Sequence, residues 1–142
     1  MKNNDAVKVA MCGLGQWGPN LLRNLRNNEG CQVVALCDQD ESRRKEFEPL
    51  HADARFYASV EEVAADKEVA AAVVATPAGL HEQHVRLLLE AGKHVLVEKP
   101  LALTLHAARR LVDLANFHEC ILMAGHTFLF NPSVRRVKEE ID

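Results

Sequence analysis

The chain has 142 residues, of which 48% are hydrophobic and 26% are charged, and its formal net charge is -3 at pH 7. This length suits one domain with one core, and the composition is typical of a folded globular protein. The slight acidic excess argues against broad attraction to nucleic acid or to anionic membranes. No run of about 18 apolar residues and no secretion signal is present, so we expect a cytoplasmic protein.

The four cysteines are widely spaced along the chain. They form no C-x-x-C pair, and the sequence offers no secretory context for a disulfide framework. We therefore interpret them as small apolar core residues rather than as metal ligands or disulfide partners; they are Cys12, Cys31, Cys37 and Cys120.

Short β-branched runs alternate with segments whose apolar residues lie three and four positions apart. The fourth run is continuously apolar, which is typical of a strand covered by helices on both faces. Repeated strand-helix-strand units predict an α/β fold with a doubly wound parallel sheet of strand order 3-2-1-4-5-6. The predicted strands span residues 7–12, 32–37, 54–57, 69–75, 94–97 and 120–124.

Helix start and stop signals support this alternation. Ser59 followed by Glu62 fits a capping box, and Thr104 is placed to cap the helix that follows it. Gly92 is expected to end the helix before the fifth strand.

The strongest local signal is the hexapeptide GLGQWG, which directly follows the first predicted strand and opens a helix. This is the G-x-G-x-x-G pattern of dinucleotide-binding folds, whose helix start offers free N–H groups to phosphates. Gly13 permits the tight turn, Gly15 lets a pyrophosphate approach the backbone, and Gly18 permits close packing of the helix on the sheet. Gln16 and Trp17 are expected at the cofactor, although Trp17 could instead pack beside the helix start.

Asp38 ends the second predicted strand, twenty residues after Gly18. A carboxylate there typically accepts hydrogen bonds from the adenosine ribose and repels a 2′-phosphate, so we expect NAD in preference to NADP. Two alternatives stay open: Asp38 caps the helix that starts near Asp40, or Arg43 or Arg44 reaches toward a 2′-phosphate.

Ligands of a doubly wound sheet bind beyond the carboxyl ends of its strands. Three segments follow the last three predicted strands: ATPAGLH, EKPL and GHTF. We expect all three to face one crevice.

Together, GLGQWG, Asp38, ATPAGLH, EKPLALT and AGHTFLFNP resemble the N-terminal domain of the Gfo/Idh/MocA oxidoreductases over essentially the whole chain. The Glu-Lys-Pro sequence is the most specific element, and GHTFLFNP is similar to members that act on nucleotide-linked amino sugars, such as UDP-N-acetylglucosamine 3-dehydrogenases. The resemblance implies hydride transfer between a nicotinamide cofactor and a secondary alcohol of a sugar, cyclitol or nucleotide sugar. The alternatives are a non-catalytic dinucleotide-binding module and a reductase of an imine or tetrapyrrole.

The resemblance also implies roles for individual residues. The Lys99 ammonium would stabilise a developing alkoxide or take part in proton transfer, and the alternative is a surface lysine paired with Glu98. His81 would line the nicotinamide end of the cofactor. Thr76, Pro77 and Glu98 would contact the cofactor beside these two residues.

The seven histidines do not predict a metal site. His81 and His84 lie three apart on one predicted helix, but no third ligand is placed to join them. His126, after the sixth strand, either approaches the substrate or makes a structural hydrogen bond.

Asn131 and Pro132 indicate the start of a last helix, whose end carries acidic residues that oppose the helix dipole. We therefore expect a sequence cut from a longer protein, with residues 1–130 forming the NAD(P)-binding domain and residues 131–142 starting the helix that leads onward. The resemblance implies that a second, α+β domain, absent here, supplies most substrate contacts and a homo-oligomer interface.

Overall fold

The computed structural model describes residues 6–141, which form one six-stranded sheet. All five strand pairs are parallel, in the order β3-β2-β1-β4-β5-β6, so the predicted α/β fold and strand order are confirmed. The strands are β1 (Val7–Cys12), β2 (Cys31–Cys37), β3 (Arg55–Tyr57), β4 (Ala71–Val74), β5 (His94–Glu98) and β6 (Leu122–Gly125).

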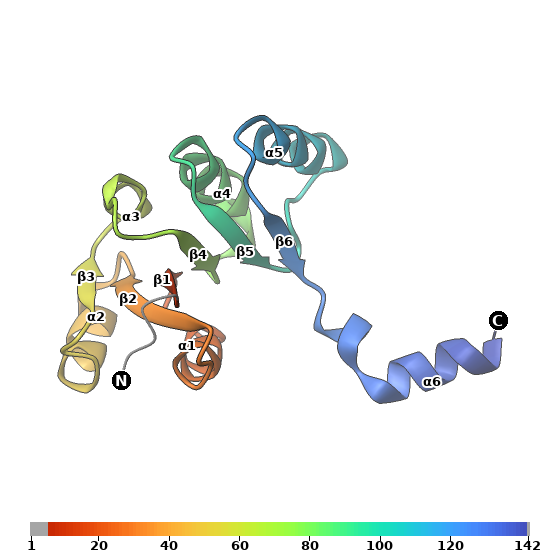
Figure 1. Ribbon diagram of the computed structural model, residues 1–142, viewed down its shortest axis with the longest axis horizontal. Coiled ribbons are helices and arrows are strands. Elements are labelled where there is room, and N and C mark those ends of the chain that lie inside the picture. Colours follow the sequence, from red (N-terminus) through yellow and green to blue (C-terminus); the bar gives the residue numbers. More distant parts are fainter. Residues whose placement is uncertain (1–5, 142) are drawn as a thin grey trace.

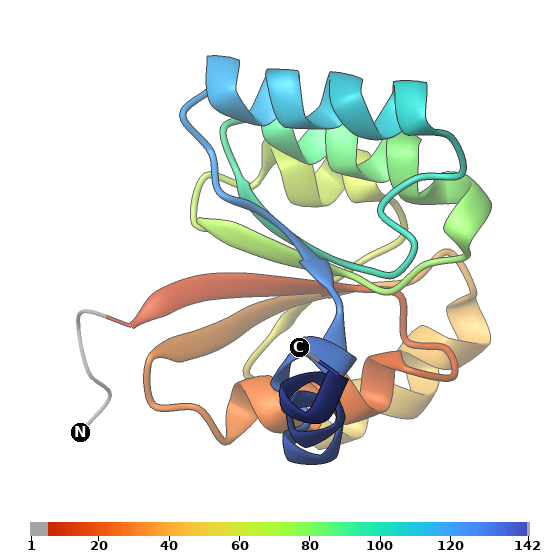
Figure 2. The same ribbon diagram turned by 90° about the vertical axis from the view of Figure 1, so that its right-hand side faces the viewer.

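Helices cover both faces of the sheet, as Figures 1 and 2 show. One layer contains α1 (Gly18–Arg26) and α2 (Glu41–Phe47). The opposite layer contains α3 (Val60–Ala65), α4 (His81–Glu90) and α5 (Leu105–Phe117). Three 3-10 turns connect elements at η1 (Glu48–Leu50), η2 (Ala78–Leu80) and η3 (Thr127–Phe130).

The core has two parts because alternate residues of each strand face opposite layers. From β1, Ala10 and Cys12 join the cluster under α3, α4 and α5, whereas Val9 and Met11 join the cluster under α1 and α2. The central strand β4 is buried in the same two-sided way, which explains its unbroken apolar sequence.

The predicted helix signals are confirmed. The Ser59 hydroxyl accepts the Glu62 backbone N–H, and the Glu62 carboxylate accepts the Ser59 backbone N–H. Thr104 Oγ1 accepts the Ala107 N–H at 3.1 Å. Gly92 follows α4 with a φ of 73°, a left-handed conformation that favours glycine.

The interpretation of the cysteines holds for two of them. All four are free; Cys12 and Cys37 are buried, but Cys31 and Cys120 are only partly buried.

The last helix, α6 (Pro132–Ile141), extends away from the sheet beyond β6 (Figure 1). Asn131 Oδ1 accepts the Ser133 N–H at 2.9 Å, as a capping residue does. Every residue of α6 is exposed. The expected domain boundary after residue 130 stays a prediction. Within residues 6–141, no helix combines the length and apolar character needed to cross a membrane.

Candidate functional site

The carboxyl ends of β1, β2 and β4 border a cavity of about 500 Å³. It lies where the strand order reverses between β1 and β4, the usual position of ligands in such sheets. Five of the predicted site residues line it: Gly13, Gly15, Asp38, Thr76 and Pro77.

The glycines of the loop after β1 answer to different constraints. Gly13 has a φ of 97°, and a Cβ there would lie 2.7 Å from the Ala75 carbonyl carbon. A Cβ at Gly15 would meet no atom within 4 Å, so Gly15 leaves open space in the cavity wall. At Gly18 the expected obstacle was the sheet, but a Cβ would first meet the Gly13 carbonyl oxygen, at 2.1 Å. Gly18 is therefore required chiefly by closure of the loop itself.

The Asp38 carboxylate connects two loops of the cavity. Oδ2 accepts the Leu14 N–H at 2.8 Å and Oδ1 accepts the Asp40 N–H at 2.9 Å. The capping interpretation of Asp38 is wrong, because the N-cap of α2 is Asp40, whose carboxylate accepts the Ser42 N–H. Both Asp38 oxygens retain acceptor capacity, since a carboxylate oxygen accommodates more than one donor.

The cavity wall carries more negative than positive charge. Asp38, Asp40 and Glu61 line it, together with Arg43. Hydrogen bonds from Ser42 lower the pKa of Asp40 and so favour its charged form. The two arginines raised as an alternative differ: Arg44 donates to the Asp38 carbonyl oxygen at 2.6 Å, whereas Arg43 faces the cavity and lies 3.6 Å from the Glu46 carboxylate.

His84 and Gln83 line the cavity although the sequence did not single them out as cofactor residues. His84 Nδ1 lies 3.0 Å from the Thr76 hydroxyl oxygen. Burial lowers the pKa of His84; the Glu61 carboxylate opposes that effect and His81 adds to it.

His81 is 1% exposed and lies beneath the loops rather than in the cavity wall. Its Nδ1 lies 2.6 Å from the Pro100 carbonyl oxygen and its Nε2 lies 2.8 Å from the Thr76 carbonyl oxygen. The side chain thus contacts the loops that follow both β4 and β5.

Lys99 follows β5 and is exposed, as part of a cis Lys99-Pro100 segment. Its backbone N–H donates to Glu98 Oε2 at 3.3 Å. Within residues 6–141 its ammonium takes part in none of the ion pairs, so the alternative of a lysine side chain paired with Glu98 is not what the structure shows.

Gln16, Trp17 and His126, which the sequence also predicted at the site, do not line the cavity. Trp17 is the N-cap of α1 and is 56% exposed, and Gln16 precedes it in the same loop. His126 is exposed beyond β6. In the part of the chain that the structure describes, no three His, Cys, Asp or Glu side chains are grouped to hold a metal ion.

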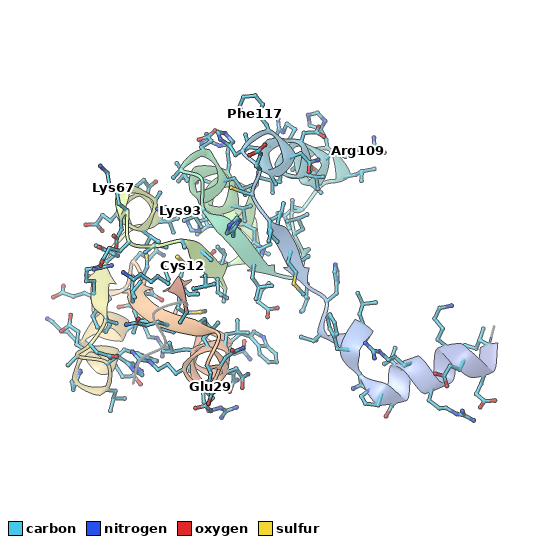
Figure 3. The ribbon with its side chains drawn as sticks, viewed as in Figure 1. Cys12, Glu29, Lys67, Lys93, Arg109 and Phe117 are labelled. Atoms are coloured by element: carbon cyan, nitrogen blue, oxygen red, sulfur yellow. The ribbon has the colours of Figure 1, made fainter. Side chains whose placement is uncertain are left out.

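Lys93 is a buried polar residue that sequence reasoning missed (Figure 3). Its ammonium donates to the carbonyl oxygens of Asp66 and Val69, at 2.7 Å each. It follows α4 and precedes β5, at the opposite edge of the sheet from the cavity, so it supports the fold rather than the site.

Comparison with known proteins agrees with this geometry. The family model for the Gfo/Idh/MocA oxidoreductases, described as an oxidoreductase family with an NAD-binding Rossmann fold, matches residues 7–126. An uncharacterized oxidoreductase of Streptococcus pneumoniae is 33% identical over 96% of this chain and 36% of its own length. Inositol 2-dehydrogenase of Acidothermus cellulolyticus is 32% identical over 99% of this chain and 42% of its own length. The chain thus spans about two fifths of the length of these curated relatives.

Solved structures give the same answer. KijD10, a 3-ketoreductase from Actinomadura kijaniata solved with NADP and TDP-benzene, superposes with a TM-score of 0.88 at 28% identity, over 96% of this chain and 42% of that one. GenD2 from gentamicin A biosynthesis, solved with NAD, superposes with a TM-score of 0.88 at 32% identity, over 95% of this chain and 38% of that one. Biliverdin reductase from Synechocystis, solved with biliverdin and NADP+, superposes with a TM-score of 0.88 at 26% identity, over 95% of this chain and 42% of that one. The chain therefore belongs to the Gfo/Idh/MocA oxidoreductase family and contains its NAD(P)-binding Rossmann fold.

Proposed function

We propose that the cavity between β1, β2 and β4 binds a dinucleotide cofactor and prefers NAD(H) to NADP(H). The carrying observation is Asp38, which lines the cavity and keeps acceptor capacity on both oxygens after bracing the loops. Asp40 and Glu61 add negative charge to the same wall. Three carboxylates and one guanidinium leave this wall with net negative charge, which disfavours a 2′-phosphate.

The residues around the cavity fit a dinucleotide. Gly15 has no neighbour within 4 Å of its Cβ position, which allows a pyrophosphate to approach the backbone. The loop leads into α1, whose first N–H groups and dipole favour phosphate. Thr76 and Pro77 form the wall on the β4 side, toward β5 and Lys99. Gln16 and Trp17 in the glycine loop, with Glu98 at the end of β5, complete the proposed cofactor site, whereas the buried His81 lies outside it.

We propose further that the protein takes part in hydride transfer between the cofactor and a secondary alcohol or ketone of a sugar, cyclitol or nucleotide sugar. Bound nicotinamide supplies or accepts the hydride. The Lys99 ammonium, exposed after β5 and free of ion pairs to residues 6–141, would stabilise negative charge on the reacting oxygen and move its proton. His126, exposed after β6, is the proposed substrate contact.

Titration of the chain with NADH and NADPH tests the cofactor proposal. Trp17 is the only tryptophan, so its fluorescence reports binding at the glycine loop. We expect tighter binding of NADH than of NADPH. No binding of either cofactor at millimolar concentration would refute the proposal, and tighter NADPH binding would reverse the cofactor preference.

The role of Lys99 needs a separate test. Lys99→Ala should leave NADH binding intact and abolish turnover of the sugar or cyclitol that the unaltered protein oxidises, because the ammonium acts on the substrate oxygen. Unchanged turnover would remove Lys99 from the mechanism.

A reductase of a tetrapyrrole is the second candidate, because the biliverdin reductase structure superposes with the same TM-score, 0.88, as the 3-ketoreductase KijD10. The two candidates are distinguished by the rate of NADH oxidation with biliverdin and with a panel of keto sugars. Oxidation with biliverdin alone would favour the tetrapyrrole reductase, and oxidation with a keto sugar alone would favour the sugar enzyme.

A further inference from the structure

His81 joins two loops of the site through both of its ring nitrogens. Nδ1 contacts the carbonyl oxygen of Pro100, at 2.6 Å, and Nε2 contacts that of Thr76, at 2.8 Å. The side chain is 1% exposed, so bulk water offers neither nitrogen another partner. Thr76 lines the cavity, and Lys99 directly precedes Pro100.

These two acceptors limit which protons the ring can carry. A backbone carbonyl oxygen only accepts hydrogen bonds, and a neutral imidazole has one N–H to donate. A neutral ring would therefore set one nitrogen lone pair against an oxygen lone pair at short range. A ring with protons on both nitrogens donates to both carbonyls and forms two charge-assisted hydrogen bonds.

We propose that His81 is a positioning residue which, as an imidazolium, ties the Thr76 loop to the Lys99-Pro100 loop and holds Lys99 in place relative to the cavity. The cross-link is a property of the fold, whereas its benefit to Lys99 chemistry rests on the proposed function. It differs from the expected role of His81 at the nicotinamide, because both ring nitrogens face backbone oxygens.

The ionisable groups near this ring come from its own helix, from α5 and from the two loops; Glu82 adjoins His81 on α4 and forms an ion pair with Arg110 of α5. The residues from Ala75 to Ala78 contribute none, and the segment around Pro100 contributes Glu98 and Lys99. His84 lies one helical turn further along α4, and its Nδ1 lies 3.0 Å from the hydroxyl oxygen of Thr76.

Ring nitrogen NMR tests the protonation directly. In the uniformly 15N-labelled chain near neutral pH, both His81 nitrogens should show the chemical shifts of protonated nitrogen. His106, exposed on α5, is the comparison histidine in the same spectrum. A pyridine-type signal from either His81 nitrogen would overturn the imidazolium.

A substitution tests the positioning role. His81→Gln cannot span both carbonyls, so the amide signals of Lys99 and Thr76 should shift and broaden, while those of the β1 and β2 strands stay in place. His106→Gln should move none of these signals. Unchanged Lys99 and Thr76 signals in His81→Gln would overturn the positioning role.

The outcomes separate this proposal from the cofactor proposal. If His81→Gln fails to fold, the ring nitrogens of the unaltered chain still decide the protonation. Failure of the unaltered chain to bind NADH would refute the cofactor site and leave the NMR result untouched. If NADH binds and His81 carries one proton, the cofactor site stands and the imidazolium is refuted.

Discussion

Asp38 at the end of β2 accepts the backbone N–H of Leu14 at 2.8 Å, which fixes the glycine loop after β1 against the neighbouring strand. Its other oxygen accepts the Asp40 N–H at the start of the next loop. One carboxylate therefore shapes the cavity wall and still presents acceptors to it. Because Asp38 both fixes the glycine loop and is the proposed partner of the ribose, its loss should weaken cofactor binding by more than the loss of one ribose hydrogen bond.

Asp38→Ala should weaken NADH binding by about tenfold or more, because a hydrogen bond to a charged group contributes about 1.5–3 kcal/mol. NADPH binding should weaken less, since the substitution also removes a charge that repels the 2′-phosphate. Trp17 fluorescence titration with both cofactors measures the two effects. Asp113→Ala, on the exposed surface of α5, is the matched control and should change neither affinity. The opposite ordering of the two cofactors would contradict the proposed role of Asp38.

The glycine loop offers a paired prediction on Gly13 and Gly15. Gly13→Ala places a Cβ 2.7 Å from the Ala75 backbone at a φ of 97°, so it should destabilise the fold by about 2 kcal/mol or more. Gly15→Ala meets no protein atom within 4 Å and should keep the stability of the fold while weakening NADH binding. Urea unfolding and NADH titration of both variants separate the two effects. Equal loss of stability in both would show that the cavity side of Gly15 is not open.

The strand order could be predicted from the sequence because buried apolar runs and right-handed crossovers leave few arrangements. Strand ends were less predictable. Val69 is buried but precedes β4, whose ladder with β1 and β5 spans residues 71–74. Hydrophobicity reports burial, whereas a strand ends where its backbone partners end, and the sequence does not show those partners.

The same limit applies to the candidate site. Gly13, Gly15 and Asp38 could be placed because they directly follow strands whose ends meet at one edge. The contacts of His81 and Lys93 could not, because they include the backbone carbonyl oxygens of Pro100, 19 residues from His81, and of Asp66, 27 residues from Lys93. Every residue has a carbonyl, so no residue type marks such a partner.

Lys93→Met should destabilise the chain by about 2 kcal/mol, because it keeps the apolar stem but removes the ammonium that donates to two carbonyl oxygens, of which that of Val69 is buried. Those oxygens belong to Asp66 and Val69, which connect α3 to β4. Urea unfolding measures the loss. Lys67→Met is the matched control, because Lys67 is exposed at the same edge of the sheet (Figure 3). Equal stabilities of the two variants would show that the buried ammonium contributes nothing.

His84 should make stability fall with acidification. Burial, opposed by Glu61 and aided by His81, holds the pKa of His84 below its usual value near 6.5. Below that value the unfolded chain takes up a proton at His84 before the folded chain does, so the free energy of unfolding decreases until the folded pKa is passed. Above it both states are neutral at this residue, and His84 adds no pH dependence.

Urea unfolding from neutral pH down to about pH 5 should therefore show a steeper loss of stability for the unaltered chain than for His84→Gln, because glutamine does not titrate. His106→Gln, which removes an exposed histidine, should keep the steeper loss. Parallel pH profiles for the unaltered chain and His84→Gln would contradict the lowered pKa.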